Sequence, residues 1–208
     1  MELHQQLNQD SGETEYYTEP FVIEAAREVM GSIDLDPASC DYANQEHVKA
    51  DVYFTQKDDG LKCKWFGNVW MNHPFSKGEN PCPKDRLKCK KKACNDPFYS
   101  KYRGHCIDDR IPSNGDWVDK LISEYQAGNI EQSCNITFGA TSEIWFQLLA
   151  QYPQCSLSPR TNYYKRNGKK LQGITKGSVV TYLGSNVEKF NAVFSPLGSV
   201  HLPYGYHR

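Results

Sequence analysis

The residues best suited to chemistry are Asn72, His73, Pro74 and Phe75, which directly follow the run Gly67–Met71. That apolar, β-branched and aromatic run is typical of a buried strand. Such a strand delivers the residues after it to the end of a sheet, where open α/β sheets bind ligands. Asn72 offers an amide, Pro74 stiffens the loop, and Phe75 offers a flat face. The loop could hold a planar, amino-bearing heterocycle such as an extruded nucleobase; the alternative is a turn followed by a core aromatic residue.

Two carboxylates, Asp34 and Asp36, lie in a short predicted strand that Pro37 ends. Residues two apart in a strand share one face. At the carboxyl end of a strand, both could accept hydrogen bonds from an amine or from ribose hydroxyls. The alternative is that they cap the next turn.

Four cysteines, Cys82, Cys89, Cys94 and Cys106, are crowded into a segment with few aliphatic residues, and His105 adjoins the last of them. A segment that cannot build an apolar core needs another means of folding. Four thiolates suit a tetrahedral structural zinc, in which His105 could replace one cysteine. Reduced, unligated cysteines are the first alternative, and disulfides are the second if the compartment is oxidising.

The segment around these cysteines is basic, although the whole chain has a formal net charge of −1. Residues 77–115 contain ten lysines and arginines but only five acidic residues. Lys90, Lys91 and Lys92 form the densest run, which could contact phosphates beside Asn72 or simply be a solvated face.

Helices and strands are predicted to alternate along most of the chain. The first helix begins near Pro20, carries apolar residues at helical spacing and ends at Gly31. Alternation of this kind predicts an α/β fold with a mainly parallel sheet covered on both faces. We expect a flexible terminus at residues 1–14 and one domain at 15–208, with residues 77–115 as a cysteine-rich basic insert.

The chain contains no run of eighteen apolar residues, and its first residues lack the pattern of a signal peptide. These features predict a cytoplasmic protein without a membrane segment.

Several motifs, in their order and spacing, resemble the phage-type DNA N6-adenine methyltransferases, the small Dam-like family of phages and prophages. The resemblance covers roughly residues 15–76 and resumes in the second half of the chain. The motifs are Tyr17-Thr18-Glu19-Pro20, Asp34-Leu35-Asp36-Pro37-Ala38, Asp59-Gly60-Leu61, Trp65 to Phe75, Thr141-Ser142, Trp145-Phe146 and Gly177-Ser178-Val179.

The resemblance implies a Rossmann-like fold that binds S-adenosylmethionine and methylates the N6 amino group of adenine in double-stranded DNA. The loop from Asn72 to Phe75 would hold the target base, and Asp59 would lie near the adenine of the cofactor. The residues implied to border the methionine end and ribose are Tyr17, Thr18, Pro20, Asp34, Asp36 and Pro37.

The chain departs from the family pattern, which is usually Asn-Pro-Pro-Tyr or Asp-Pro-Pro-Tyr, at two loop positions. Phe75 keeps the stacking face of tyrosine, whereas His73 replaces a rigid proline. His73 could touch a phosphate, shuttle a proton or simply pack. The departure leaves open other acceptors, namely cytosine N4, RNA or a different adenine modification.

The glycine-rich cofactor loop of larger methyltransferases and a separate target-recognition domain are also missing. A zinc-containing nucleic-acid-binding protein with a degenerate methyltransferase fold is therefore the remaining alternative. If DNA is the substrate, its recognition would fall to the cysteine-rich insert and a second basic loop. That loop supplies Arg160, Lys165, Arg166, Lys169 and Lys170.

Overall fold

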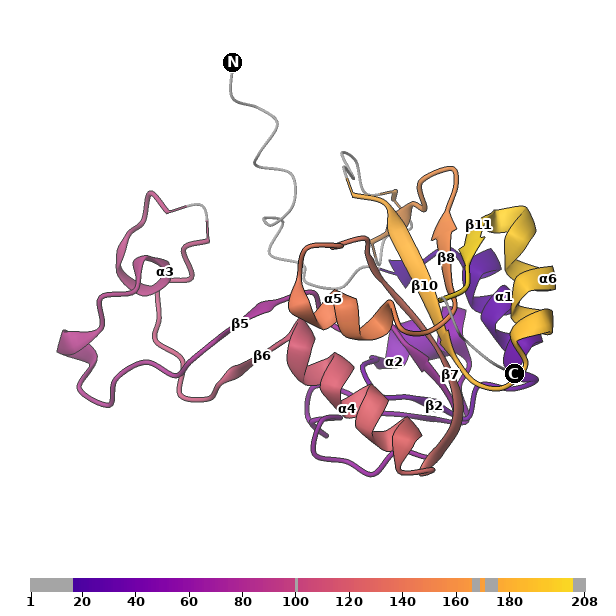
Figure 1. Cartoon of the computed structure of the whole chain (residues 1–208). Helices are drawn as coiled ribbons and strands as arrows, with labels where there is room; N and C mark the ends of the chain where they lie inside the picture. The colour runs from indigo at the N-terminus through magenta and orange to yellow at the C-terminus, as the bar shows by residue number, and fades with distance from the viewer. Residues whose placement is uncertain (1–16, 100, 166–168, 171–175, 204–208) are drawn as a thin grey trace, which may run out of the picture.

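The computed structural model describes residues 17–99, 101–165, 169–170 and 176–203. The predicted flexible terminus, residues 1–14, lies outside this described part of the chain. The centre of the molecule is a seven-stranded sheet with helices on both faces (Figure 1). The helices are α1 (Pro20–Met30), α2 (Asp41–Ala43), a π-helical turn (Asn44–Val48), α3 (Lys92–Asn95), α4 (Asn114–Gln126), α5 (Ile144–Leu149) and α6 (Val187–Phe194), with 3₁₀ turns at Arg86–Lys88 and Ser195–Leu197.

The sheet has the strand order β11-β8-β10-β7-β4-β2-β3. Two further ribbons, β1–β9 and β5–β6, lie outside it. The strands are β1 (Tyr17–Thr18), β2 (Leu35–Asp36), β3 (Val52–Tyr53), β4 (Gly67–Met71), β5 (Lys77–Glu79), β6 (Ile111–Ser113), β7 (Ile130–Phe138), β8 (Gln154–Leu157), β9 (Tyr163–Tyr164), β10 (Ser178–Leu183) and β11 (Gly198–His201).

The α/β prediction is confirmed, but the prediction of a mainly parallel sheet is wrong. The strands β3, β2, β4 and β7 are parallel, whereas β10 is antiparallel to both β7 and β8, and β11 is antiparallel to β8. The reason lies in the connection between β8 and β10, whose described part contains no helix. Without a crossover helix the chain returns in the opposite direction, and β10 enters the sheet between β7 and β8.

Two apolar layers hold the helices to the sheet. On one face, α1 and α6 cover Trp70, Ile136 and Val180. On the other face, α4 and α5 cover Val69 and Met71. Alternate residues of β4 therefore point into different layers, as the pleat of a strand requires. The predicted first helix is present as α1, and Gly31 follows it with a φ of 89°.

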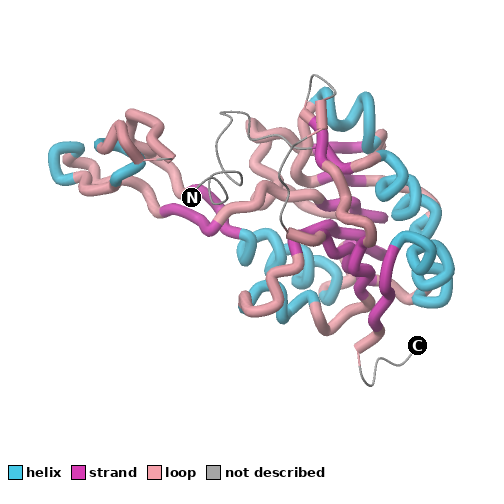
Figure 2. Tube along the Cα trace, turned by 90° about the horizontal axis from the view of Figure 1, so that it is seen from above, coloured by secondary structure: helices cyan, strands magenta, loops and turns pink. Residues whose placement is uncertain are grey.

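The cysteine-rich insert projects from this core on the β5–β6 ribbon (Figures 1 and 2). We call residues 80–110, between the two strands, the cysteine module. The base of the ribbon is fixed by a capping box between Ser113 and Asp116 at the start of α4. Ser76 is tied to the same place, since its backbone N–H donates to the Asn114 side chain at 3.1 Å. The module is thus anchored directly after the Asn72–Phe75 loop.

Among the described residues, none of the helices combines the length and the apolar character needed to cross a membrane.

Candidate active site and metal centre

Asn72 lies just beyond the carboxyl end of β4, at the edge where the parallel strands β2, β4 and β7 end. Its side-chain Nδ2 donates to Thr18 Oγ1 at 3.2 Å. Thr18 is buried in β1, one residue before Glu19 and the start of α1. The hydrogen bond joins residues 54 positions apart and turns the acceptor oxygen of Asn72 away from Thr18.

The side chain of His73 is only 1% exposed. Its ring stacks on Trp117 at a centroid distance of 6.2 Å and meets Phe75 edge-on at 5.3 Å. Burial lowers the pKa of His73 to about 4, because the charged ring is poorly solvated, and a contact with Asn114 opposes this only in part. His73 is therefore neutral at pH 7 and packed inward, so it is not placed to contact a phosphate.

Phe75 lies half-buried beyond His73 and packs on Phe138 at 4.5 Å between ring centroids. Phe138 in turn meets Tyr163 of β9 at 5.9 Å. Pro74 is exposed between the two rings of the loop. The rings of the loop therefore belong to a packed row that runs from Trp117 of α4 to Tyr163 of β9. This packing holds the loop in place and compensates for the rigidity that a proline at position 73 would supply.

Two buried polar side chains of β7 were not identified from the sequence. The amide of Asn135 and the hydroxyl of Thr137 make no hydrogen bonds within the described part of the chain. Asn135 is in register with Met71, the residue before Asn72, and Thr137 follows on the same face. Buried polar groups left unpaired are costly, so their presence points to a water molecule or a ligand at this edge. The signal available in the sequence was the alternation of the polar residues Ser133, Asn135 and Thr137 with apolar ones in this strand.

The two predicted carboxylates lie at opposite ends of β2. Asp36 is at the carboxyl end, 3% exposed, and accepts from the Ala38 backbone N–H at 3.1 Å. Asp34 is at the amino end, where it accepts from Ser32 Oγ at 2.7 Å and from the Asn68 backbone N–H at 2.8 Å. Asp34 thus supports the start of β4, and the structure separates it from the Asn72 edge.

Asp59 and Pro37 are brought together by Gly60. A Cβ atom on Gly60 would lie 1.9 Å from the Pro37 carbonyl oxygen, so the turn requires glycine there. Asp59 has a φ of 54° and forms an ion pair with Lys62 at 2.7 Å. The turn containing Asp59 therefore borders the Asp36–Pro37 loop.

Tyr17 belongs to an aromatic group that the sequence did not predict. Its ring stacks with His47 at 5.4 Å and meets Tyr42 at 5.0 Å. His47 lies in the π-helical turn, a geometry that is frequent at functional sites. Pro20, three residues after Tyr17, begins α1.

The comparisons with known proteins identify no family. No family model matches the chain, and neither a curated protein nor a solved structure matches it. The site must therefore be interpreted from its own chemistry.

The four cysteines of the module form a cluster that could hold a metal ion. The Sγ atoms of Cys82, Cys89, Cys94 and Cys106 all lie within 4.8 Å of one another, and those of Cys82 and Cys94 are 3.6 Å apart. Tetrahedral zinc with Zn–S bonds of about 2.3 Å separates its sulfur atoms by about 3.8 Å. The sulfur spacing of the cluster is therefore compatible with a zinc site. All four cysteines are free thiols, so the cluster contains no disulfide.

An ion-pair network supports the cluster. Arg103 donates to both oxygens of Glu79 at 2.8 and 2.7 Å and to Cys94 Sγ at 3.3 Å. Lys91 Nζ is 3.0 Å from Glu79, and Arg103 is the main cause that holds the pKa of Glu79 at about 2. Lys91 is thus paired inside the module, whereas Lys90 and Lys92 are exposed.

The second basic loop adjoins the Asn72 edge through β9, which pairs with β1 and places Tyr163 opposite Thr18. Arg160, Lys169 and Lys170 are exposed, and the Lys165 backbone N–H donates to the Lys169 carbonyl at 3.0 Å. Arg166 lies outside the described residues. The pairing of β9 with β1 therefore brings this basic loop near Thr18, the hydrogen-bond partner of Asn72.

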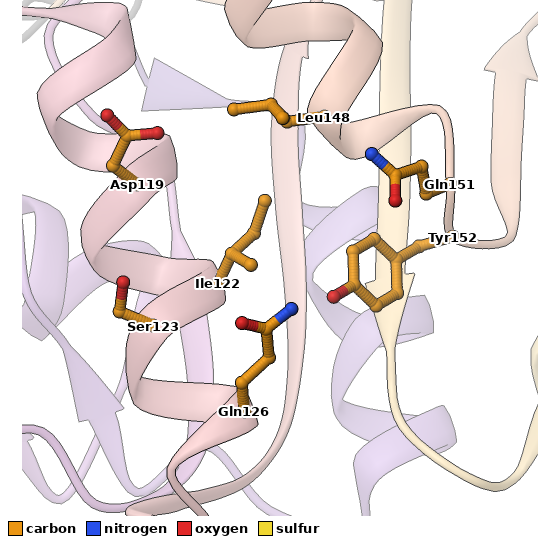
Figure 3. Close-up of a pocket in the computed structure, with 7 residues that line it drawn as sticks. All are labelled: Asp119, Ile122, Ser123, Gln126, Leu148, Gln151 and Tyr152. Carbon is orange, nitrogen blue, oxygen red and sulfur yellow. The ribbon is translucent and has the colours of Figure 1, made fainter.

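A cavity of about 340 Å³ lies elsewhere, in the groove between α4 and α5 (Figure 3). None of the predicted site residues lines it. Its lining residues are Asp119, Ile122, Ser123, Gln126, Leu148, Gln151 and Tyr152.

Asp36 predicts a pH-dependent stability. Burial raises the pKa of Asp36 to about 7 from the ordinary 3.8. Between these values the unfolded chain releases a proton that the folded protein retains, so Asp36 lowers stability as the pH rises from about 4 to about 7. Asp36→Asn keeps an acceptor for Ala38 and removes the charge. Because such a pKa shift is worth at most about 4 kcal/mol, and each kcal/mol moves Tm by about 2–4 °C in a chain of this size, we expect Tm at pH 8 to rise by up to roughly 10 °C.

The measurement is calorimetric unfolding of the parent and Asp36→Asn at pH 4 and pH 8. The difference in Tm should be largest at pH 8 and vanish near pH 4. Asp51→Asn, at an exposed position, is the matched control. A variant that is no more stable than the parent at pH 8 would contradict the destabilising charge.

Proposed function

We propose that this protein is an S-adenosylmethionine-dependent methyltransferase with a Rossmann-like fold that methylates the N6 amino group of adenine in DNA. The observation that carries the proposal is the loop Asn72–Phe75, which lies at the carboxyl end of β4 and is oriented by the hydrogen bond to Thr18. Ligands of open α/β sheets bind at this edge. The order of motifs that resembles the phage-type family adds support.

The residues at this edge fit the cofactor. Asp36 is a buried carboxyl group at the end of β2, and Asn135 and Thr137 present buried polar atoms without partners in the described part of the chain. Tyr17, Thr18, Pro20 and Pro37 would border the cofactor, with Asp59 nearby. When bound, S-adenosylmethionine supplies a methyl group on a positively charged sulfur.

The loop would act on the base by positioning and electrostatics. An exocyclic amine is a weak nucleophile because its lone pair is delocalised into the ring. If Asn72 Oδ1 and the His73 backbone carbonyl accept its two hydrogens, the nitrogen becomes more tetrahedral and its lone pair is directed outward. Phe75 would stack on the base. The side chain of His73 packs against Trp117 and Phe75, so only its backbone carbonyl is assigned a role in the step.

The test is nucleoside mass spectrometry of unmodified duplex DNA incubated with the protein and S-adenosylmethionine. We expect N6-methyladenine with the parent protein and at least about 100-fold slower formation with Asn72→Ala. Methylated cytosine, or methylation of RNA but not of DNA, would contradict the proposed acceptor. Calorimetry that detects no binding of S-adenosylmethionine or S-adenosylhomocysteine would contradict the methyltransferase proposal itself.

A further inference from the structure

The cysteine module is joined to the candidate site by a short, ordered connection. Strand β5 begins two residues after Phe75, and the ribbon carries the module away from the core (Figures 1 and 2). The strands of the ribbon pair from Lys77 with Ser113 to Glu79 with Ile111. A ligand held by the Asn72 loop and extending past it on this side would therefore meet the module.

Several cations of the module have no acidic partner. Arg86 and Lys88 are paired with Asp108 and Asp85, and Lys91 and Arg103 are paired with Glu79. Lys84, Lys90, Lys92 and Lys101 are exposed and form no ion pair with any residue that the structure describes. This excess of positive charge is complementary to a polyanion.

The module also presents two apolar side chains to solvent. Leu87 is 97% exposed and Phe98 is 98% exposed. The backbone at each residue is fixed by an aspartate two positions earlier. Asp85 Oδ1 accepts from the Leu87 backbone N–H at 3.2 Å, and Asp96 Oδ1 accepts from the Phe98 backbone N–H at 3.0 Å. An aspartate that bonds the backbone two residues ahead fixes a tight turn. Both side chains are thus displayed on ordered turns beside Cys89 and Cys94.

We propose that the cysteine module is an arm that binds duplex DNA, in which Lys84, Lys90 and Lys92 contact phosphates while Leu87 and Phe98 contact base edges or a base step. This inference rests on the proposed function for the choice of DNA. Phosphate contacts position a protein on the duplex, and apolar wedges unstack base steps in many proteins that deform DNA. The ribbon carries this wedge away from the core, so it would deform the duplex at a distance from the base that the Asn72 loop would hold.

The lysines are tested by fluorescence anisotropy with the full-length, zinc-loaded protein and a labelled DNA duplex at several salt concentrations. In Lys84→Ala/Lys90→Ala/Lys92→Ala, the salt dependence of log K should become shallower by about 0.9 for each lost phosphate contact, hence by up to about 3. The matched control is Lys49→Ala/Lys64→Ala/Lys189→Ala, which removes the same charge outside the module. It should keep the salt dependence of the parent.

The apolar residues are tested in the same assay with Leu87→Ala/Phe98→Ala. Loss of base contacts should weaken binding by about tenfold with the salt dependence unchanged. Both residues are almost fully exposed, so one equivalent of zinc should remain bound and confirm that the module folds.

Three results would overturn the proposal that the module binds duplex DNA. The lysine variant could bind DNA like its control, the apolar variant could bind like the parent, or the parent could prefer an RNA duplex of the same sequence. Failure of the proposed function is distinguishable from these results. If mass spectrometry found no methylated base while DNA binding still depended on the module, the DNA-binding role of the module would be retained and the methyltransferase proposal would be rejected.

Discussion

Replacing Asn72 by alanine should lower the rate of methyl transfer to DNA by about 10²–10³-fold, the effect of removing one hydrogen-bonding group aimed at developing charge. Binding of S-adenosylmethionine should be nearly unchanged, since the proposed role of Asn72 is to accept a hydrogen from the base. The measurements are single-turnover methylation of a DNA duplex and calorimetric titration with the cofactor.

Two further variants separate the acceptor from its orientation. Asn72→Asp keeps an acceptor oxygen and should retain more activity than Asn72→Ala. Thr18→Val removes the hydroxyl that orients the amide, so it should reduce the rate less than Asn72→Ala does. Because Thr18 is also proposed to border the cofactor, the rates are compared at saturating S-adenosylmethionine. Full activity of Asn72→Ala, or loss of cofactor binding equal to its loss of rate, would contradict the assigned role.

Removing the metal should unfold the cysteine module and leave the sheet intact. Protein prepared without chelators should contain one equivalent of zinc, because four thiolates converge in a segment whose apolar cluster contains little besides cysteine. Structural zinc binding contributes about 10–16 kcal/mol at pH 7, far more than this small cluster can supply. We expect trypsin to cleave at the lysines of the module only after chelation.

Cys89→Ser should reproduce the effect of chelation, since it removes one ligand. Cys63→Ser is the matched control, because Cys63 lies outside the module and is only partly buried. The zinc assignment would be contradicted by metal analysis that finds far less than one equivalent. Equal resistance to trypsin with and without chelator would contradict the structural role of the metal.

The Asn72 loop and the cysteine cluster could be recognised from the sequence because the information is local. An apolar run ending in Asn72 predicts a strand that delivers its loop to a sheet edge, and four cysteines in a core-poor segment predict a shared ligand. The first helix was predictable for the same reason, since its apolar spacing, Pro20 and Gly31 all lie within one short segment.

Only the tertiary structure decided which of the candidate residues lie together. Strand spacing placed Asp34 and Asp36 on one face, but Asp34 is bound to Asn68 at the opposite end of the strand. A run of three lysines did not reveal that Lys91 is paired with Glu79. In both cases the partner is distant in sequence and is chosen by pairing between segments.

The direction of β10 and the position of Asn135 beside Met71 have the same origin. Hydrophobic pattern identifies a strand and its buried face, whereas its neighbours and direction depend on the length and geometry of its connections. The pairing of β1 with β9, which brings Thr18 and the second basic loop to Asn72, is another such contact. The sequence by itself determined the elements and their chemistry, and long-range pairing in the folded chain decided which side chains share the site.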